Sequence, residues 1–289
     1  MPYTTVRQAW AHLRRALEDI GSPDAPREAE LLLTASLGWD TARLLAHPDA
    51  WVPPEVRERL FAWLARRWAR EPVPYILGEW EFYGQRLEVS PAVMVPRPET
   101  EALVESALAW AGKHFPNGRG LRVADIGTGS GAIVIALALH LRHAVFYGVD
   151  ASAPALEVAR RNARRWGVEE RIVFVHGDLA QPLPCPVHLI TANLPYIPSP
   201  RLAHLQPEVA RWEPRMALDG GPDGTALQRR LLTLVQEKLC SPGLLLLEMD
   251  PEQAFLLQEE AQRYLPGAMI AFDTDAAGTC RVLRVERGS

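Results

Sequence analysis

Cysteine, lysine and long apolar runs are all scarce in this chain of 289 residues. The three cysteines, Cys185, Cys240 and Cys280, lie far apart and form no Cys-x-x-Cys pair. A scattered odd number of cysteines argues against a disulfide framework and a zinc site, and it is typical of proteins in a reducing cytosol. We therefore expect no metal site and a cytoplasmic location.

The apolar runs are too short to cross a membrane. The longest, AIVIALALHL, falls well below the roughly 18 apolar residues that a spanning helix requires. The first residues, MPYTTVRQAW, reach Arg7 and Gln8 before any apolar stretch develops, so they do not predict a signal peptide. We expect no association with a membrane.

The chain also has no excess of positive charge: its formal net charge is −4. The only lysines are Lys113 and Lys238, and we interpret this arginine preference as genome composition or growth temperature rather than mechanism. The net charge supplies no general attraction to nucleic acid, although a local basic patch would be compatible with it. We expect no direct nucleic-acid binding.

What is present resembles an ordinary globular protein, with 48% hydrophobic and 23% charged residues. The length exceeds the roughly 100–200 residues of one domain, so a main domain with a smaller one is expected.

Residues 1–75 predict a small all-helical domain. Apolar residues recur at helical spacing, and the first two helical stretches end at Gly21 and Gly38. In the stretch PPEVRERLFAWLARRWAREP we expect four apolar residues to face inward, namely Leu60, Phe61, Leu64 and Trp68. The arginines of this stretch predict a solvated helix face, with a partner-binding surface as the alternative; they are Arg57, Arg59, Arg66, Arg67 and Arg70.

Residues 76–98 predict a β-hairpin linker, because short alternating runs such as EFYGQRLEVS lie among prolines, glycines and aromatics. In residues 99–289 short apolar strands alternate with helical stretches, which indicates an α/β domain with a mainly parallel sheet. The last two strands, in AMIAFD and TCRVLRV, are expected to form an antiparallel pair at the sheet edge.

The stretch ADIGTGSGAIVIA predicts a strand, a glycine-rich turn and a helix, the order that a nucleotide cofactor requires. By itself this turn fits a dinucleotide as well as S-adenosylmethionine. The candidate cofactor-binding residues of the turn are Gly127, Thr128, Gly129, Ser130 and Gly131. Asp150, at the end of the next predicted strand, suits a ribose diol in either case.

The ends of the next strands favour S-adenosylmethionine over NAD. The third strand is followed by Asp178 and Leu179, a carboxylate for an exocyclic amine beside an apolar surface for one adenine ring. The fourth strand ends at Asn193. Because the carboxyl ends of parallel strands meet at one edge of a sheet, these residues form a candidate cofactor site there.

The fourth strand continues into Asn193-Leu194-Pro195-Tyr196. An amide or aromatic amine is a poor nucleophile, and two acceptors on its N–H groups would orient it and stabilise the charge that develops as it attacks a methyl group. Asn193 offers a side-chain carbonyl and Leu194 a backbone carbonyl, while Pro195 fixes the turn. Tyr196 offers a flat face to a planar amide or base. We predict Asn193 and Tyr196 as catalytic and all four residues as substrate-binding.

Motifs along most of the chain resemble those of the release factor glutamine methyltransferases. The most specific are PYILGEWEFYG and PRPETE, which generic methyltransferases lack. The others are VADIGTGSGAIVIALA, GVDASAPALEVARRNA, GDL, ITANLPYIP, EPRMALDGGPDG and GTCRVLRVER.

The resemblance implies a helical N-terminal domain joined by a hairpin to a Rossmann-like methyltransferase sheet. It also implies S-adenosylmethionine-dependent N5-methylation of the glutamine in the Gly-Gly-Gln motif of peptide chain release factors, which would be the partners. The glycine turn, Asp150, Asp178, Leu179 and Asn193 would meet the cofactor, and Asn193 to Tyr196 would hold the glutamine amide. Residues 97–100 would lie near the cleft.

The chain departs from the family pattern at two places. Leu194 stands where the family usually has proline. A leucine at this place resembles the Asn-Leu-Pro-Tyr motif of the rRNA adenine dimethyltransferases, but leucine keeps the backbone carbonyl. In LEMDPEQ, at Met249-Asp250, relatives usually carry a glycine. Two other functions therefore stay open: an N6-methyltransferase for adenine in RNA or DNA, and a non-catalytic scaffold that binds S-adenosylmethionine.

Overall fold

The computed structural model describes residues 4–288, and it divides the chain into two compact units. The helical unit contains the described residues up to Gly78 together with Pro207–Trp212. The sheet unit contains Glu79–Gln206 and the described residues from Glu213 on. The domain limits predicted from the sequence remain a prediction, and the segment Pro207–Trp212 is an addition to them.

The helical unit is built from amphipathic helices whose ends follow local signals. Thr5 caps the first helix in a capping box with Gln8, and Gly38 ends the second with a φ of 66°. Leucines such as Leu13, Leu32 and Leu60 are completely buried in its core. Its helices are α1 (Val6–Asp19), α2 (Ala25–Leu37), α3 (Thr41–Ala46), α4 (Pro54–Trp68), α5 (Val73–Leu77) and α9 (Pro207–Trp212).

The inward face predicted for α4 is partly wrong. Leu60 and Leu64 are buried, but Phe61 and Trp68 are 64% and 57% exposed. The buried stripe continues from Leu64 to Arg67, which is only 1% exposed and lies on the same helical face. The expectation of a solvated arginine face therefore fails for Arg67.

Arg67 is buried because two acidic side chains compensate its charge. Its Nε and Nη2 donate to the two carboxylate oxygens of Glu28, both at 3.0 Å. Nη2 also lies 2.8 Å from Glu208 on α9, and Arg70 pairs with the same carboxylate at 3.0 Å. These four residues, called the arginine cluster below, fasten α9 to α2 and α4 within the helical unit.

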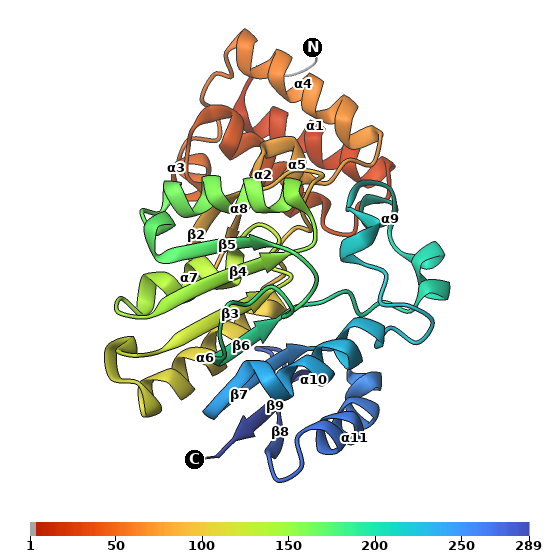
Figure 1. Ribbon diagram of the computed structural model, residues 1–289. Helices are drawn as coiled ribbons and strands as arrows, with labels where there is room; N and C mark the ends of the chain where they lie inside the picture. The colour runs from red at the N-terminus through yellow and green to blue at the C-terminus, as the bar shows by residue number, and fades with distance from the viewer. Residues whose placement is uncertain (1–3, 289) are drawn as a thin grey trace. The chain divides into compact units, whose positions relative to one another are not determined.

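The sheet unit has a seven-stranded sheet in the order β5-β4-β3-β6-β7-β9-β8 (Figure 1). The first five strands are parallel, whereas β9 is antiparallel to both β7 and β8. The strands are β3 (Arg122–Ile126), β4 (Val145–Asp150), β5 (Ile172–His176), β6 (Val187–Ala192), β7 (Leu239–Glu248), β8 (Met269–Thr274) and β9 (Cys280–Arg287).

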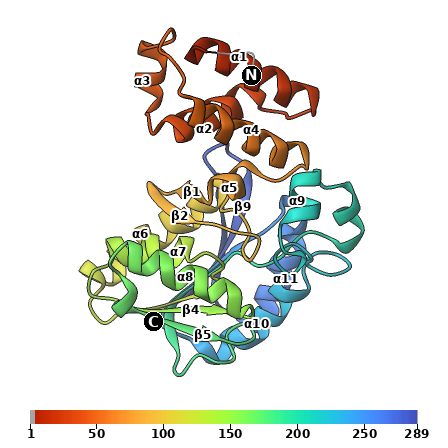
Figure 2. The same cartoon turned by 90° about the horizontal axis from the view of Figure 1, so that it is seen from above.

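Helices cover both faces of this sheet, as its double-sided apolar pattern requires. Successive residues of β7 alternate between two cores, with Leu244 and Leu246 in one and Leu245 and Leu247 in the other. Figure 2 shows α6, α7 and α8 grouped together and α10 and α11 grouped apart from them. These helices are α6 (Glu101–His114), α7 (Ala132–His140), α8 (Ala153–Arg165), α10 (Ala226–Lys238) and α11 (Ala254–Tyr264).

The predicted hairpin is present as β1 (Glu79–Phe82) and β2 (Gln85–Glu88), paired antiparallel. Asn162 of α8 holds it in place, because its side chain bonds both the N–H and the C=O of Glu88. Between the hairpin and α6 lies a short 3-10 helix, η1 (Pro98–Thr100).

The predicted α/β class, with a mainly parallel sheet and an antiparallel pair at its edge, is confirmed. Within residues 4–288, each helix is too short or too polar to span a bilayer. Strand order reverses at β3, which has β4 on one side and β6 on the other. Ligands of open α/β sheets bind at such a point, beyond the carboxyl ends of the strands.

Candidate active site

A cavity of about 280 Å³ lies at this edge of the sheet, entirely within the sheet unit. Its walls come from the carboxyl ends of the parallel strands and from two covering segments, residues 92–100 and 214–217. It is lined by ten of the predicted site residues: Gly127, Thr128, Gly129, Ser130, Asp150, Asp178, Leu179, Asn193, Leu194 and Pro195. The other two, Gly131 and Tyr196, do not line it. Residues far apart in the sequence are thus brought together.

The glycine turn is held from below by Asp125, a completely buried residue of β3. Thr128 Oγ1 donates to one of its oxygens at 2.7 Å and Thr191 Oγ1 to the other at 2.9 Å. Burial raises the pKa of Asp125 to about 6, against the effect of these two hydroxyls. Asp125 therefore ties the turn to β6, and sequence reasoning missed it because it lies inside a predicted strand.

Gly127 shows why this turn needs glycine. Its φ is 73°, a region that side chains disfavour, and a Cβ there would lie 3.0 Å from Leu194 Cδ2. The backbone N–H groups of Gly127 and Thr128 are taken by the Val149 carbonyl at the end of β4. These bonds fix the turn against β4. Because the turn lies beside the start of α7 and its glycines carry no side chain, a ligand in the cavity can approach its backbone closely.

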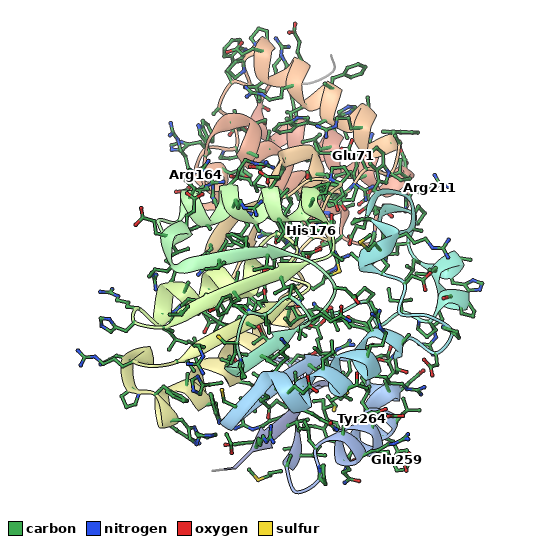
Figure 3. The ribbon with its side chains drawn as sticks, viewed as in Figure 1. Glu71, Arg164, His176, Arg211, Glu259 and Tyr264 are labelled. Carbon is green, nitrogen blue, oxygen red and sulfur yellow. The ribbon has the colours of Figure 1, made fainter. Side chains whose placement is uncertain are left out.

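Asp150 completes this rim. Its Oδ2 accepts from the Gly129 N–H and its Oδ1 from the Ser152 N–H, both at 2.8 Å. Burial raises the pKa of Asp150, and these backbone bonds and nearby His176 oppose that rise. His176, labelled in Figure 3, ends β5, and its Nε2 lies 3.0 Å from the Ala151 carbonyl. Each carboxylate oxygen of Asp150 keeps acceptor capacity, as a diol ligand requires.

Asp178 and Leu179 follow β5 at the same edge. Asp178 forms an exposed ion pair with Arg230 of α10. Leu179 is buried and has a φ of 49°, an uncommon value for a branched side chain. This backbone places a leucine side chain directly in the cavity wall beside the carboxylate.

Asn193 is oriented by Thr100 of η1. Its Nδ2 donates to Thr100 Oγ1 at 3.0 Å, so its carbonyl oxygen is left for another partner. No described residue donates a hydrogen bond to the Leu194 carbonyl. The Leu194 side chain is buried in the core beneath the glycine turn. Leucine is therefore accommodated here, and two carbonyl acceptors remain at the cavity edge.

Tyr196 is half-buried, and its hydroxyl donates to Glu248 Oε1 at 3.2 Å. Burial, together with the charge of Glu248, raises its pKa well above the ordinary value of a tyrosine. Burial likewise raises the pKa of Glu248 to about 7. Glu248 ends β7 as Asp150 ends β4, so the same pattern of a polar residue at a strand end could have identified it.

The segment 218–224 supports the chain after this turn. Ile197 donates to the Leu218 carbonyl at 3.1 Å and accepts from Gly220 at 2.9 Å. Gly224 has a φ of 78°, and a Cβ there would collide with the Tyr196 carbonyl. That carbonyl also accepts from Gln253 Nε2 at 2.8 Å. The motif EPRMALDGGPDG thus builds the support for the Asn-Leu-Pro-Tyr turn.

The two covering segments are joined by an ion pair between Arg97, which is partly exposed, and the buried Glu213, directly before Pro214. Burial raises the pKa of Glu213, although Arg97 and the Val95 backbone lower it in part. The prediction that residues 97–100 lie near the cleft agrees with Thr100 in the cavity wall and Arg97 beside it.

Met249 and Asp250 fit the end of β7 without the glycine that relatives usually carry. Asp250 has a φ of −73°, which any residue adopts, so no glycine is required. Its side chain caps the 3-10 helix η6 (Pro251–Gln253), and it lies 3.6 Å from Arg201. Met249 is completely buried in the core. Aspartate here stabilises the turn that holds Gln253 in place.

Comparisons with known proteins agree with this geometry. The family model described as the PrmC N-terminal domain matches residues 8–78, and the one described as a methyltransferase domain matches residues 123–212. A solved methyltransferase from Pyrococcus furiosus has a TM-score of 0.50 at 17% identity and covers 81% of this chain and 98% of its own. That likeness supports the Rossmann-like methyltransferase fold.

Curated relatives extend over most of the chain. The release factor glutamine methyltransferase of Geobacter sulfurreducens is 41% identical over 86% of this chain and 86% of its own length. That of Coxiella burnetii is 36% identical over 98% of this chain and 99% of its own. With this identity over nearly the whole length, the chain belongs to the family of release factor glutamine methyltransferases.

Proposed function

We propose that this protein uses S-adenosylmethionine to methylate the side-chain nitrogen N5 of the glutamine in the Gly-Gly-Gln motif of peptide chain release factors, in the cytoplasm. The observation that carries the proposal is the pair of carbonyl acceptors at the cavity edge: Asn193, oriented by Thr100, and Leu194, whose carbonyl has no donor among the described residues. The family relationship supports the same substrate.

The cavity residues fit the cofactor. The glycine turn presents its backbone to the cavity, Asp150 offers two acceptor oxygens for a diol, and Leu179 gives an apolar surface. Bound S-adenosylmethionine supplies a methyl group on a positively charged sulfur, which leaves as a neutral thioether.

The protein's task is to orient the glutamine amide. Its two N–H groups would donate to the Asn193 side-chain carbonyl and the Leu194 backbone carbonyl, which aims the nitrogen lone pair at the methyl carbon. As the N–C bond forms and the C–S bond breaks, positive charge develops on the nitrogen beside these two oxygens. The methylated nitrogen then loses one proton, and since that proton is acidic, no buried general base is needed.

The helical unit and the exposed arginines of α4 are proposed to contribute to recognition of the release factor. This assignment rests on the family relationship of residues 8–78. The exposed side chains of Phe61 and Trp68 on α4 add apolar surface on which a protein partner could pack.

Methyl transfer from labelled S-adenosylmethionine tests the function. The protein is incubated with a release factor, with the same factor carrying Gln→Ala in Gly-Gly-Gln, or with total RNA. We expect label only in the unchanged release factor. Label in RNA would favour the adenine methyltransferase instead, and cofactor binding without transfer to either acceptor would favour a scaffold.

Asn193→Ala tests the acceptor pair. Removing one preorganised carbonyl should cost about 2–4 kcal/mol of transition-state stabilisation, a fall in kcat of roughly 30- to 1,000-fold. The affinity for S-adenosylmethionine, measured by calorimetry, serves to separate loss of orientation from loss of cofactor. Near-normal turnover in this variant would contradict the proposed role.

A further inference from the structure

A buried network leads from Asn193 away from the cavity. Asn193 Nδ2 donates to Thr100 Oγ1, and the Thr100 hydroxyl lies beside Glu248 and lowers the pKa of that carboxyl group. Because Ala192 of β6 pairs with Leu247 of β7, Asn193 and Glu248 follow paired positions on neighbouring strands. Glu248 itself does not line the cavity, so it can act only through its neighbours.

Glu248 is completely buried, and the hydroxyl groups of Tyr196 and Thr100 both lower the pKa of its carboxyl group. Tyr196 donates to its Oε1, whereas Oε2 has no hydrogen-bond partner among the described residues and is therefore an open acceptor for the proton of the Thr100 hydroxyl. The charged groups that act on it are Glu99 of η1 and Arg281 of β9. A carboxylate only accepts hydrogen bonds, so it draws the protons of both hydroxyls toward itself.

The direction of these protons decides which end of the Asn193 amide faces the cavity. When Thr100 turns its proton to Glu248, its lone pairs face Asn193 and can receive only the amide N–H. The carbonyl oxygen then faces the other way. If Thr100 turned its proton to Asn193, the amide would rotate and present N–H groups, which cannot accept from the N–H groups of a glutamine amide.

We propose that Glu248 is a positioning residue that acts through Thr100 to hold the Asn193 carbonyl oxygen toward the methyl acceptor. The inference rests on the proposed function and deepens it. Tyr196 belongs to the same network, because its hydroxyl stabilises the charged form of Glu248. Its role in catalysis would then include support of the carboxylate.

Two conservative changes at Thr100 test the link. Thr100→Val removes the hydroxyl and should lower kcat by about tenfold or more, while KM for the release factor and the cofactor Kd change by less than about threefold. Thr100→Ser keeps the hydroxyl and should retain at least about half of the wild-type kcat. A Thr100→Val enzyme within about twofold of wild type would overturn the proposal.

A double-mutant cycle tests Glu248 itself. Glu248→Gln should lower kcat in the wild-type background and have little further effect when Thr100 is already valine, because the two changes break one connection. Independent, multiplying effects would overturn the proposal. If Glu248→Gln does not fold, as thermal melting would reveal, the valine and serine pair at Thr100 still decides.

The pH profile gives a readout that a purely structural role would not move. The kcat of the wild type should fall as the pH is lowered through about 7, where Glu248 takes up a proton, and this fall should be absent in Thr100→Val. The same fall in Thr100→Val would count against the link. If the wild type itself transfers no methyl group, the proposed function fails; if it transfers and Thr100→Val equals it, only this inference fails.

Discussion

The two units bury charged side chains in different ways. In the arginine cluster of the helical unit, Glu28 and Glu208 are compensated by Arg67 and Arg70. In the sheet unit, the buried carboxyl groups of Asp125 and Glu248 are bonded chiefly by hydroxyl groups. A full positive charge and a hydroxyl both satisfy an oxygen, but only the former offsets the loss of solvation of a charged group.

The pKa values record this difference. Burial alone would raise the pKa of Glu208, but its hydrogen bonds and the charges of Arg67 and Arg70 outweigh burial and lower it. The pKa of Asp125 is raised to about 6 and that of Glu248 to about 7, in each case chiefly by burial. The carboxylate of Glu208 in the helical unit therefore stays charged at neutral pH, whereas Asp125 and Glu248 in the sheet unit titrate close to neutral pH.

The largest expected effect comes from removing the central cation of the cluster. Arg67→Met should destabilise the helical unit by about 3–5 kcal/mol, because it leaves two partly buried carboxylates without their main partner. Hydrogen exchange of the helical-unit amides in the full chain measures the change.

Arg7→Met is the matched control. Arg7 pairs with Asp49 at 3.3 Å in the same unit, but both side chains are largely exposed. This change should cost less than about 1 kcal/mol. Equal effects of the two substitutions would show that burial of the cluster contributes nothing.

The next effect is a pH dependence of opposite sign in the two units. Because the pKa of Asp125 is raised in the folded protein, its contribution to stability is complete below about pH 4 and is lost as the pH rises through about 6. The unfolding free energy of the wild type relative to Asp125→Asn should therefore fall over this range. At about 1.4 kcal/mol per pKa unit, the fall is on the order of 2–3 kcal/mol.

Glu208→Gln should behave in the reverse manner. The pKa of Glu208 is lowered, so its contribution is present above its unfolded pKa and is lost as the pH falls through the folded value. The wild type should gain stability relative to this variant as the pH rises from the acid range toward the ordinary pKa of a glutamate, 4.5. Urea unfolding across pH gives both slopes, and slopes of the same sign would refute the comparison.

A smaller effect is expected from breaking the Arg97–Glu213 ion pair, in which a buried carboxylate has a cationic partner and still has a raised pKa. Glu213 is paired with Arg97, as in the cluster, yet its pKa is raised by burial, as in the sheet unit. Arg97→Met should raise the pKa of Glu213 further and destabilise the sheet unit by about 1–2 kcal/mol, less than a charge with two partners. It should also weaken cofactor binding, since the covering segments lose their link; an unchanged Kd would show that this link does not shape the cavity.

Much of the fold could be predicted from local patterns. Parallel strands buried on both faces leave continuous apolar runs, and the helices between them end at recognisable glycines and prolines. The face of α4 was harder, because Arg67 reads as a solvated residue until Glu28 and Glu208 are known to surround it. Those partners lie 39 and 141 positions away in the sequence, so no local pattern reveals them.

The site was predictable where a single residue ends a strand, as Asp150 and Asn193 do. It was not predictable where a residue acts through another. Thr100 belongs to a motif noticed for its specificity, but its bond to Asn193 depends on how η1 folds over the strand ends. Glu248 carried the same strand-end signal as Asp150, and only its buried surroundings distinguish their tasks.

The helical unit is discontinuous in the sequence, since α9 supplies Glu208 from a segment nearly 130 positions after Gly78. A gene fragment that ends at Gly78 would therefore encode Arg67 and Arg70 without one of the carboxylates that neutralise them. Conversely, a fragment that begins at Glu79 would carry Glu208 and Trp212 without the surface that covers them. Exchange of this domain between relatives by simple recombination near residue 78 would have to preserve a matching α9, so the two stretches are expected to be inherited together.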